Sequence, residues 1–534
     1  MTARSLVGLI ALAFGALTAR PAAAQVPDPA PPADAPGDAG LPAGPPASTS
    51  ASPPAPAPAA TPAPGPSSGQ PSYTDQIDRE QLRKLVWGQR GTQPSSPWDR
   101  TTAETMSARW RSNLYGFVEL DAMHDSTQSY GPSSNNAMLA RPGTYAAFHG
   151  RTQFTANNSL FGFMLKAPDW GRLHTFGHVE VDFFGVQPSD ALEQQVYTAP
   201  SVRMRLFYFR LRQDFFTRAS VDLLVGQYHD LFAWGGAGFY PHSIAFLGIA
   251  GEVYHRNPQI RGTLSIPLCC VTLDIAAAAV RPVQRDSEVP DVQGGVKLSL
   301  DRWRGVGAQG FGQPDILPLS IGVSGIWRRF AVAEFLPVPG EPKIAFGWGL
   351  AVDAFVPVIP ARSPIDRKNA LSLNAEFTTG SGIADLYTGL TGGALFPTLP
   401  NPGNLDPAPL YRPNIDSGMV TFDADGNPKT IDWRAIVVGF QYYLPVADGR
   451  LWVSGNYSQL KSNNIVNLTP ENSRGGVFYW QEYYDANAYA ALTPAVQLGL
   501  SYQYTHQFFG DRPFGGAHPE SHNHRAELGF RFFF

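Results

Sequence analysis

Apolar and polar side chains alternate along most of the chain from Leu114 to its end. In the segment 344–356, apolar residues fill every second position, and the other face holds the small or polar residues Gly347, Gly349, Ala351 and Asp353. The segments 114–122 and 496–505 repeat this pattern. Because successive side chains of a β-strand point to opposite faces, these segments are predicted to be strands with one apolar and one polar face.

The predicted strands are longer than those of ordinary soluble sheets, which have about five or six residues. Long two-faced strands are typical of a transmembrane antiparallel β-barrel, in which the apolar faces meet lipid and the polar faces line the lumen. About 16 such strands are expected, at 114–125, 146–167, 172–184, 203–216, 219–229, 253–266, 270–280, 291–301, 317–329, 343–356, 370–380, 432–444, 451–460, 476–490, 495–508 and 524–534. Long outer loops should alternate with short inner turns, and only 302–316 and 357–369 are longer than inner turns usually are.

The last strand, 524–534, gives the clearest indication of a membrane barrel. One face holds Ala526, Leu528, Phe530, Phe532 and Phe534, and the other holds Arg525, Glu527, Gly529, Arg531 and Phe533. Alternation that ends on a terminal Phe resembles the assembly signal of Gram-negative outer-membrane barrels, so we expect recognition by the barrel assembly machinery. The alternative, an apolar edge strand of a soluble sheet, is disfavoured because natural proteins avoid exposed hydrophobic edges.

The N-terminal part differs in composition. Arg4, the apolar run 6–17 and Ala22-Ala23-Ala24 together predict a signal peptide over 1–24. Residues 25–71 are rich in Ala and Pro and are expected to be a disordered periplasmic tether. Residues 72–110 are expected to hold a short helix and a linker, the helix serving either oligomerisation or periplasmic docking, or simply packing near the barrel rim. The barrel then spans 111–534.

Overall composition excludes several classes of protein. The net charge is −4, which gives no field for binding nucleic acid. Charged residues make up 16% and aromatic residues 12%, as suits a barrel that is apolar on one face only. Cys269 and Cys270 are adjacent, too close for an ordinary disulfide, and are interpreted as small strand residues. The chain lacks the common nucleophile, phosphate-binding and metalloprotease motifs, so neither enzymatic activity nor a cofactor is expected.

Candidate functional residues are those predicted to face the lumen. If Phe207, Phe209 and Leu211 face lipid, then Tyr208, Arg210, Arg212 and Asp214 point inward, since arginine facing lipid costs about 2–4 kcal/mol. Arg203 and Arg205 have the opposite phase and are expected at the outer rim or beyond a bulge. Arg151 and Arg261 also lie on polar faces. These arginines would either attract anions or pair with Glu119, Asp121, Glu180 and Asp182 across the barrel wall, and the sequence does not separate the two alternatives.

Other polar groups are given simpler interpretations. His174, His178, Glu180 and Asp182 share the inward phase, and are expected to be lumenal lining and not a metal site. His518, His522 and His524 are expected as solvated residues of an outer loop. The segment 423–427 resembles part of a calcium loop but lacks the later ligands, so a polar turn is favoured.

The loop 230–252 is the third outer loop in this count and is rich in aromatic residues. Trp234, Phe239 and Tyr240 are candidates for a constriction that folds into the lumen, because full exposure of these side chains would be costly. The alternative is a clamp on a neighbouring subunit.

Several motifs together resemble those of the DcaP-like trimeric porins of Gram-negative outer membranes. They are Gly116-Phe117-Val118-Glu119-Leu120-Asp121, Val181-Asp182-Phe183-Phe184-Gly185, Phe209-Arg210-Leu211-Arg212, Leu224-Val225-Gly226-Gln227 with Leu231-Phe232, and 256–261, with 347–350 as later support. The resemblance implies a homotrimer whose lumen passes small anionic solutes such as dicarboxylates, with Arg210, Arg212 and Arg261 as candidate contacts. The family would have an N-terminal coiled coil where this chain has its tether.

The functional hypothesis is therefore an outer-membrane porin for passive diffusion of small hydrophilic, anionic solutes. The alternative is a surface-exposed structural or binding barrel that opens no channel. An outer-membrane enzyme would need a nucleophile beside a histidine on the lipid-facing surface, and the sequence shows none.

Overall fold

The computed structural model describes residues 110–131, 138–185, 200–215, 219–234, 249–307, 316–333, 340–361, 366–388, 415–416, 418–423, 427–510 and 519–534. All of them belong to the compact unit that spans residues 79–534. The expected signal peptide (1–24), tether (25–71) and nearly all of the helix and linker (72–110) lie outside the described residues, so these predictions stay predictions.

Most described residues are in strands. The strands are β1 (Arg111–Asp125), β2 (Arg151–Thr155), β3 (Leu160–Lys166), β4 (Leu173–Asp182), β5 (Arg203–Asp214), β6 (Ser220–His229), β7 (Arg256–Leu268), β8 (Val271–Val280), β9 (Asp291–Val306), β10 (Ile316–Ala333), β11 (Pro342–Ile359), β12 (Leu371–Ser381), β13 (Val420–Phe422), β14 (Pro428–Thr430), β15 (Asp432–Tyr443), β16 (Leu451–Ser462), β17 (Phe478–Ala491), β18 (Val496–Phe509) and β19 (Glu520–Phe533). The α-helices α3 (Tyr145–Phe148) and α5 (Ile465–Leu468) are single turns, and 3-10 turns cover Arg285–Ser287, Ala384–Leu386, Val446–Gly449 and Glu471–Gly476. Within the described ranges, no helix has both the length and the apolar character needed to cross a bilayer.

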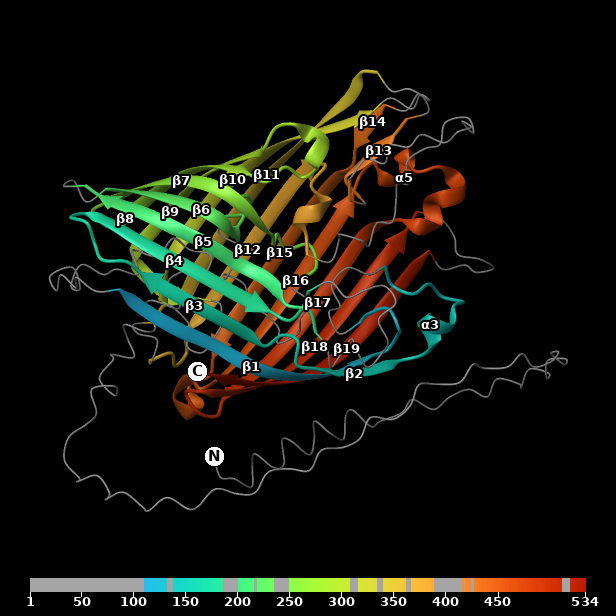
Figure 1. Ribbon diagram of the computed structural model, residues 1–534. Helices are drawn as coiled ribbons and strands as arrows, with labels where there is room; N and C mark the ends of the chain where they lie inside the picture. Colours follow the sequence, from blue (N-terminus) through green and yellow to red (C-terminus); the bar gives the residue numbers. More distant parts are fainter. Residues whose placement is uncertain are drawn as a thin grey trace, which may run out of the picture. The chain divides into compact units, whose positions relative to one another are not determined.

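The strands close into one barrel (Figure 1). Neighbours in the sheet follow each other in sequence and run antiparallel, and β19 pairs with β1 to complete the ring. The sheet has 17 strands because β2 and β3 pair with successive parts of β1, so the circumference is that of a 16-strand barrel. The predicted fold class and strand number are confirmed. The segment 146–167, expected as one strand, is interrupted between Thr155 and Leu160.

The two faces of the wall are chemically opposite, as the alternation predicted. On β11, Phe346 and Trp348 are 56% and 53% exposed on the outside, whereas Asp353 is 1% exposed on the inside. The same division holds on β1, where Leu114, Val118 and Leu120 are exposed on the outer face. Apolar outer side chains can be solvated by lipid, and the polar inner side chains find partners within the barrel.

The two ends of the barrel differ in the length of their connections. At the short-turn end, β7 joins β8 through Cys269 and Cys270 alone, and Cys269 has a positive φ of 58°. The cysteines are therefore turn residues, and their interpretation as strand residues is wrong. The long-loop end carries α3, α5 and the β13–β14 hairpin (Figure 1). The long inner connections expected at 302–316 and 357–369 shorten to 307–315 and 360–370, because β9 and β11 continue further than expected.

The seam between the first and last strands is tightly built. The backbone N–H groups of Gly116 and Phe534 each donate to the other residue's carbonyl oxygen at 3.1 Å. A Cβ atom at Gly116 would lie 2.3 Å from the Leu160 carbonyl oxygen, so only glycine fits there. Near the other end of the seam, buried Arg525 donates two hydrogen bonds to Asp125, at 2.8 and 2.7 Å. The terminal strand thus closes the ring through backbone and ionic contacts together.

Candidate pore lining

The arginine-rich strand β5 places its charges on the inner face. Phe207 and Phe209 are exposed outside, and Tyr208 and Arg210 are buried inside, as predicted. The β4–β5 register shifts after Glu180, which faces Leu206 while Val181 faces Met204. This bulge leaves Arg205 unmatched in the ladder and turns it inward, so the expectation of a bulge for the out-of-phase arginines is confirmed.

Most of these arginines are paired with carboxylates in the adjacent wall. Arg203 contacts Asp182 at 2.7 Å, and Arg205 contacts Glu180 at 2.8 Å and Asp182 at 2.9 Å. Of the two alternatives left by the sequence, ion pairing describes these groups. A buried pair of this kind holds both partners in fixed positions, since removing one partner leaves the other charge uncompensated.

Arg210 and Arg212 are paired as well. Arg210 donates to Asp222 on β6 through Nε at 3.0 Å and Nη2 at 2.5 Å. Arg212 donates to Asp214 at 2.7 Å, and His174 lies 3.4 Å from the same carboxylate. Sequence reasoning missed Asp222, although its inward phase between Ser220 and Leu224 was a usable signal.

Arg261 on β7 is different. Its side chain is buried, its guanidinium donates to Gln259 Oε1 at 3.0 Å and to the carbonyl oxygen of His229, and it lies over the Tyr228 ring. No carboxylate pairs with it within the described residues. Lys297, on the inner face of β9, has one distant carboxylate, Asp274 at 3.9 Å. Of the arginines predicted to line the lumen, Arg261 and Arg151 have no carboxylate partner within the described residues, and Arg261 is the one with a lysine, Lys297, on the same part of the wall.

The remaining predicted lining residues lie on β1 and β2. Glu119 pairs with Arg531 of β19 at 2.7 Å, and Arg151 donates to the carbonyl oxygen of Tyr130 at 3.0 Å. Asp121 is completely buried and has no ion pair in the part of the chain that is described. Four other buried carboxylates have none either within the described residues: Glu252, Glu376, Asp485 and Glu527.

The inward groups of β4 form hydrogen bonds with other wall residues. His178 contacts the Tyr115 hydroxyl at 2.5 Å and the Tyr208 hydroxyl at 3.2 Å. The Tyr115 hydroxyl also donates to Glu180 at 2.7 Å. His178 and Glu180 thus belong to a network that links three strands, and His174 lies apart from them near the short-turn end.

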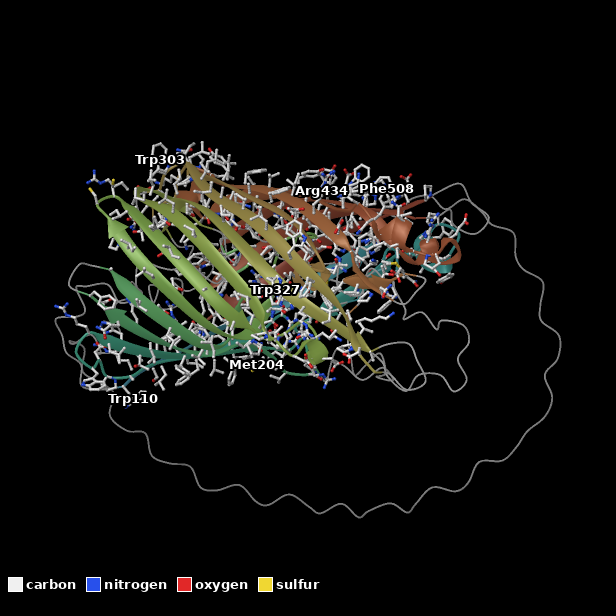
Figure 2. All side chains as sticks on the ribbon, turned by 90° about the horizontal axis from the view of Figure 1, so that it is seen from above. Trp110, Met204, Trp303, Trp327, Arg434 and Phe508 are labelled. Atoms are coloured by element: carbon white, nitrogen blue, oxygen red, sulfur yellow. The ribbon has the colours of Figure 1, made fainter. Side chains whose placement is uncertain are left out.

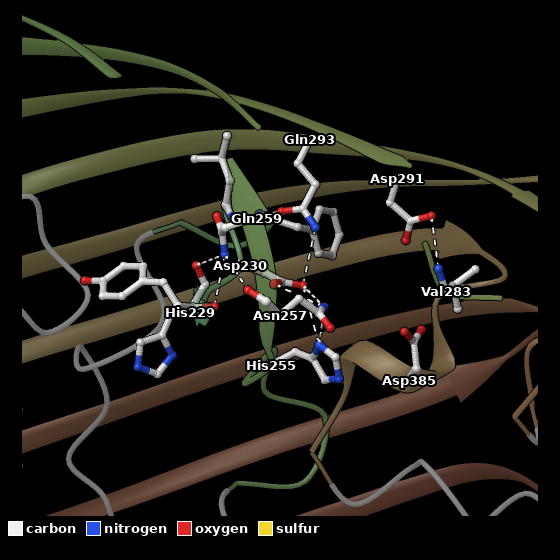
Figure 3. A network of polar contacts seen from close by, with 12 residues as sticks. His229, Asp230, His255, Asn257, Gln259, Val283, Asp291, Gln293 and Asp385 are labelled. Atoms are coloured by element: carbon white, nitrogen blue, oxygen red, sulfur yellow. Dashed lines mark hydrogen bonds and ion pairs between the residues drawn. The ribbon is translucent and has the colours of Figure 1, made fainter. Parts of the chain in front are cut away.

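The described ends of the loop 230–255 lie inside the barrel. Asp230 is the centre of their anchoring network (Figure 3). It accepts hydrogen bonds from Asn257 at 3.1 and 3.2 Å and from Gln293 at 3.3 Å, and it lies 3.5 Å from the ring of His255. Burial lowers the pKa of His255, but the hydrogen bond and charge of Asp230 outweigh it, so that this pKa lies above its ordinary value.

Further contacts carry the same loop across the inner wall. Leu231 and Phe232 donate their backbone N–H groups to Gln293 at 2.7 and 2.9 Å, and Ala233 donates to Ser324 of β10 at 2.8 Å. Further along the loop, Ser458 of β16 donates to the Ala250 carbonyl oxygen. Trp234 is buried against β8, with the Lys297 ammonium 4.9 Å from its ring. Phe239 and Tyr240, the other constriction candidates, lie outside the described residues.

A second loop joins the first inside the mouth of the barrel. Thr388 donates its backbone N–H to the Glu252 carbonyl oxygen at 2.8 Å, and Gly251 donates to that of Thr388 at 3.0 Å. Residues of both loops pack with inward side chains of β10, β15 and β16 in one apolar cluster, which includes Phe232, Val253, Ile326, Leu386, Tyr387, Trp433 and Leu460. These loops therefore fill part of the lumen at the long-loop end.

His522 and His524 are not loop residues, which corrects the sequence interpretation. Both lie within β19 with their side chains on the outer face of the barrel. His524 Nδ1 is 2.6 Å from the Tyr502 hydroxyl of β18. The strands at this end continue beyond the point expected from their apolar alternation. His518 lies outside the described residues.

A closed barrel with an apolar exterior, a charged interior and inward-folded loops defines the class of outer-membrane porins. Among solved structures, the chain is similar to the outer membrane channel DcaP of Acinetobacter baumannii, with a TM-score of 0.54 and 17% identity over 80% of this chain and 98% of that chain. It is also similar to the anion-selective porin from Comamonas acidovorans, with a TM-score of 0.42 and 11% identity over 80% of this chain and 100% of that one. No family model and no curated protein matches the sequence. The likeness to DcaP shows that the fold is that of a DcaP-like porin.

Proposed function

We propose that the protein is an outer-membrane channel of a Gram-negative cell that allows passive diffusion of small hydrophilic solutes and favours anions such as dicarboxylates. Its closed barrel and polar interior support the channel, as does the fold it has in common with a protein described as an outer membrane channel. The observation that carries the preference for anions is Arg261, a lumenal guanidinium without a carboxylate partner in the described part of the chain.

The charges of β7 and β9 favour an anion on that side of the lumen. Arg261 presents a planar fork that can bind a carboxylate through two hydrogen bonds, and Lys297 adds a second positive charge nearby. Arg210 and Arg212 contribute less, because Asp222 and Asp214 already neutralise them. A solute with two carboxylates would meet Arg261 and then Lys297, whose partner Asp274 is 3.9 Å away.

Buried carboxylates without ion pairs lie on other strands, namely Asp121 on β1, Glu376 on β12 and Glu527 on β19. They lie away from β7 to β9 in the strand order of the barrel, so they do not neutralise Arg261 or Lys297. A permeating anion is therefore drawn to the wall of β7 to β9, which gives a preference among ions without a closed binding pocket.

The test is the reversal potential of the purified channel in planar bilayers under a salt gradient. We expect wild-type protein to favour chloride over potassium, and Arg261→Gln to reduce or abolish this preference while the barrel stays folded. Arg302→Gln is the matched control, because Arg302 is exposed on the outer face of β9. An unchanged reversal potential in Arg261→Gln would reject Arg261 as the selective group, and the absence of any conductance would reject the channel itself.

The alternative function, a structural or binding barrel without an open channel, has one observation in its favour. The apolar cluster shows that loops occupy part of the lumen at the long-loop end. If this packing closes the lumen, the wild-type protein will show no conductance steps, and a variant in which Phe232 and Leu386 of the cluster are both replaced by Ser will show them. Conductance steps in the wild-type protein would reject the closed barrel and support the channel.

The assembly also belongs to the proposal. We propose a homotrimer that reaches the outer membrane through the barrel assembly machinery, with the N-terminal tether in the periplasm and outer-membrane lipid around the wall. The DcaP-like fold supports the trimer, and the alternating apolar face of β19 supports assembly by that machinery and contact with lipid. Light scattering of the purified protein after size-exclusion chromatography gives the number of subunits, and a monomer would reject the trimer.

A further inference from the structure

The outer face of β15 to β19 carries rows of polar and aromatic side chains near the long-loop end. Residues that are direct neighbours across the strands form these rows. The row nearest the strand ends is Arg434, Lys461, Trp480, Phe508 and Glu520; the next is Ile436, Gln459, Glu482, His506 and His522; the third is Val438, Tyr457, Tyr484, Tyr504 and His524. The face therefore changes from tyrosines to cations towards the ends of the strands.

The aromatic rows mark where the hydrocarbon of a membrane gives way to headgroups. Trp480 and Phe508 stack with ring centroids 4.7 Å apart, and Tyr457 and Tyr484 lie 5.0 Å apart. Further from the strand ends the outer face is apolar, as at Phe440. Aromatic girdles of membrane barrels occupy the interface between lipid and water. The first row then lies on the headgroup side of this girdle.

Two cations in that row stand side by side without a counter-charge. Arg434 and Lys461 are directly opposite each other on adjacent strands, and Arg434 is exposed. Neither has an ion pair within the described residues, and the Lys461 ammonium lies 5.5 Å from the centroid of the Trp480 ring. Like charges in directly opposed positions destabilise a sheet, so the pair has a cost that an anionic partner would remove.

The acidic groups on this face do not neutralise the pair. Glu520 pairs with His506, whose Nε2 lies 3.2 Å from the Glu520 carboxylate. Glu482 is diagonal to Lys461 and lies one row further from the strand ends. The direct neighbours of Arg434 across the strands are Thr379 and Lys461, and neither is acidic, which leaves room for an external anion beside it.

We propose that Arg434 and Lys461, with Trp480 and Phe508 beside them, form a binding surface for the phosphate group of a membrane lipid. The guanidinium fork can hold two phosphate oxygens, and the ammonium adds a point charge to the same group. The stacked aromatic rings pack against the part of the lipid next to its headgroup. Figure 2 labels Arg434 and Phe508 along the same edge of the barrel, on the side away from Trp110.

The proposal does not depend on an open lumen, because the surface is on the outer wall. It commits to a lipid and not to a second copy of the chain, since the cations lie on the headgroup side of an aromatic girdle. A second copy would need an acidic counterpart, and the outward Glu482 and Glu520 lie on the same patch.

The experiment compares lipid retention by native mass spectrometry of the full chain. Phosphatidic acid, which has a phosphate monoester, is compared with diacylglycerol, which lacks it, and glycerol phosphate serves as the free headgroup. Wild-type protein is expected to retain phosphatidic acid at least tenfold more strongly than diacylglycerol, and the variant Arg434→Gln/Lys461→Gln should lose most of this difference. Arg302→Gln, which removes an exposed outer-wall cation at the short-turn end, should retain the wild-type preference.

Each other result counts against the proposal. Equal retention of phosphatidic acid by the wild-type protein and the double variant would overturn it, and so would an equal loss in Arg302→Gln. Displacement of phosphatidic acid by equimolar glycerol phosphate would mean a free phosphate site and not a lipid site. A smaller oligomer in the double variant with unchanged lipid retention would assign the surface to contacts between copies. The single variants Arg434→Gln and Lys461→Gln, each expected to weaken retention several-fold, replace the double variant if it does not refold.

Discussion

Replacing Glu252 tests whether a proton helps to hold the loops inside the barrel. Glu252 is completely buried in the strip where the two loops pair, and neither of its carboxylate oxygens has a regular hydrogen-bond partner among the described residues. The adjacent Val253 donates its backbone N–H to Glu376 at 2.9 Å, and Glu376 lies directly opposite Asp353 on β11. Glu252 therefore faces other carboxylates and no partner cation in the described part of the chain.

The direction of the effect follows from this arrangement. Burial raises the pKa of Glu252 well above its ordinary value near 4.5; the backbone of Ile249 offsets a part, and Asp485 raises the pKa further. In the undocked loop the carboxyl is hydrated and has its ordinary pKa. Docking thus takes up a proton at any pH between these two pKa values, so the docked state is most favoured at low pH and becomes less favoured as the pH rises.

The size of the effect on the docking free energy follows from the same shift in the pKa of Glu252. Each unit of pKa difference corresponds to about 1.4 kcal/mol of docking free energy, and an uncompensated buried charge costs about 3–5 kcal/mol. One proton changes the docking equilibrium by at most about tenfold per pH unit. The glutamine of Glu252→Gln cannot ionise, so we expect the loop of this variant to stay docked at alkaline pH. The number of protons taken up on docking should be smaller by about one than in the wild-type protein.

The assay is hydrogen exchange of the backbone amides of Gly251, Val253 and Thr388 between pH 5 and 10, corrected for the intrinsic exchange rate. Wild-type protection should fall as the pH rises, and the profile of Glu252→Gln should be flatter. Glu288→Gln is the control, because Glu288 is exposed on a different loop and pairs with Arg329. Protection that rises with pH, or the same profile in wild-type and Glu252→Gln protein, would refute the reasoning.

Two further predictions concern the seam and the orientation of the barrel. Arg525→Gln leaves buried Asp125 without its cation and should destabilise the barrel by about 3–5 kcal/mol. The measurement is the temperature at which the folded band is lost in a gel, which should be lower in the variant. An unchanged temperature would show that the pair does not stabilise the seam. Exposed Cys269 in the short β7–β8 turn should react with a maleimide polymer too large for the lumen only after the outer membrane is opened, and labelling in intact cells would reverse the assigned orientation.

The sequence predicted the barrel because lipid and lumen impose opposite chemistry on alternate residues, and this constraint is local. The inward phase of Glu119, Asp121 and Arg210 follows from the same constraint. Prediction from this alternation fails where the strand extends beyond the lipid. His522 lies in β19 at its long-loop end, where polar outer side chains cost little, so the hydrophobic pattern gave no sign of a strand before residue 524.

The contacts between lining residues could not be predicted in the same way. Asp222 meets Arg210 because of the register between β5 and β6, and the β4–β5 bulge decides which way Arg205 points. Register and bulges depend on the whole ring and not on one strand. The burial of Glu252 depends on how two loops far apart in sequence pair with each other, for which no local pattern exists.

These contacts change which arginine is expected to set selectivity. The resemblance implied Arg210, Arg212 and Arg261 alike, but Asp222 and Asp214 already hold the first two. Replacing Arg210 would leave buried Asp222 uncompensated, and would make the wall more negative and the barrel less stable at once. A loss of anion preference in that variant would therefore not identify a solute contact. Arg261 has no carboxylate to release within the described residues, so its replacement separates selectivity from stability, and the wall of β7 is where the channel's preference should be measured.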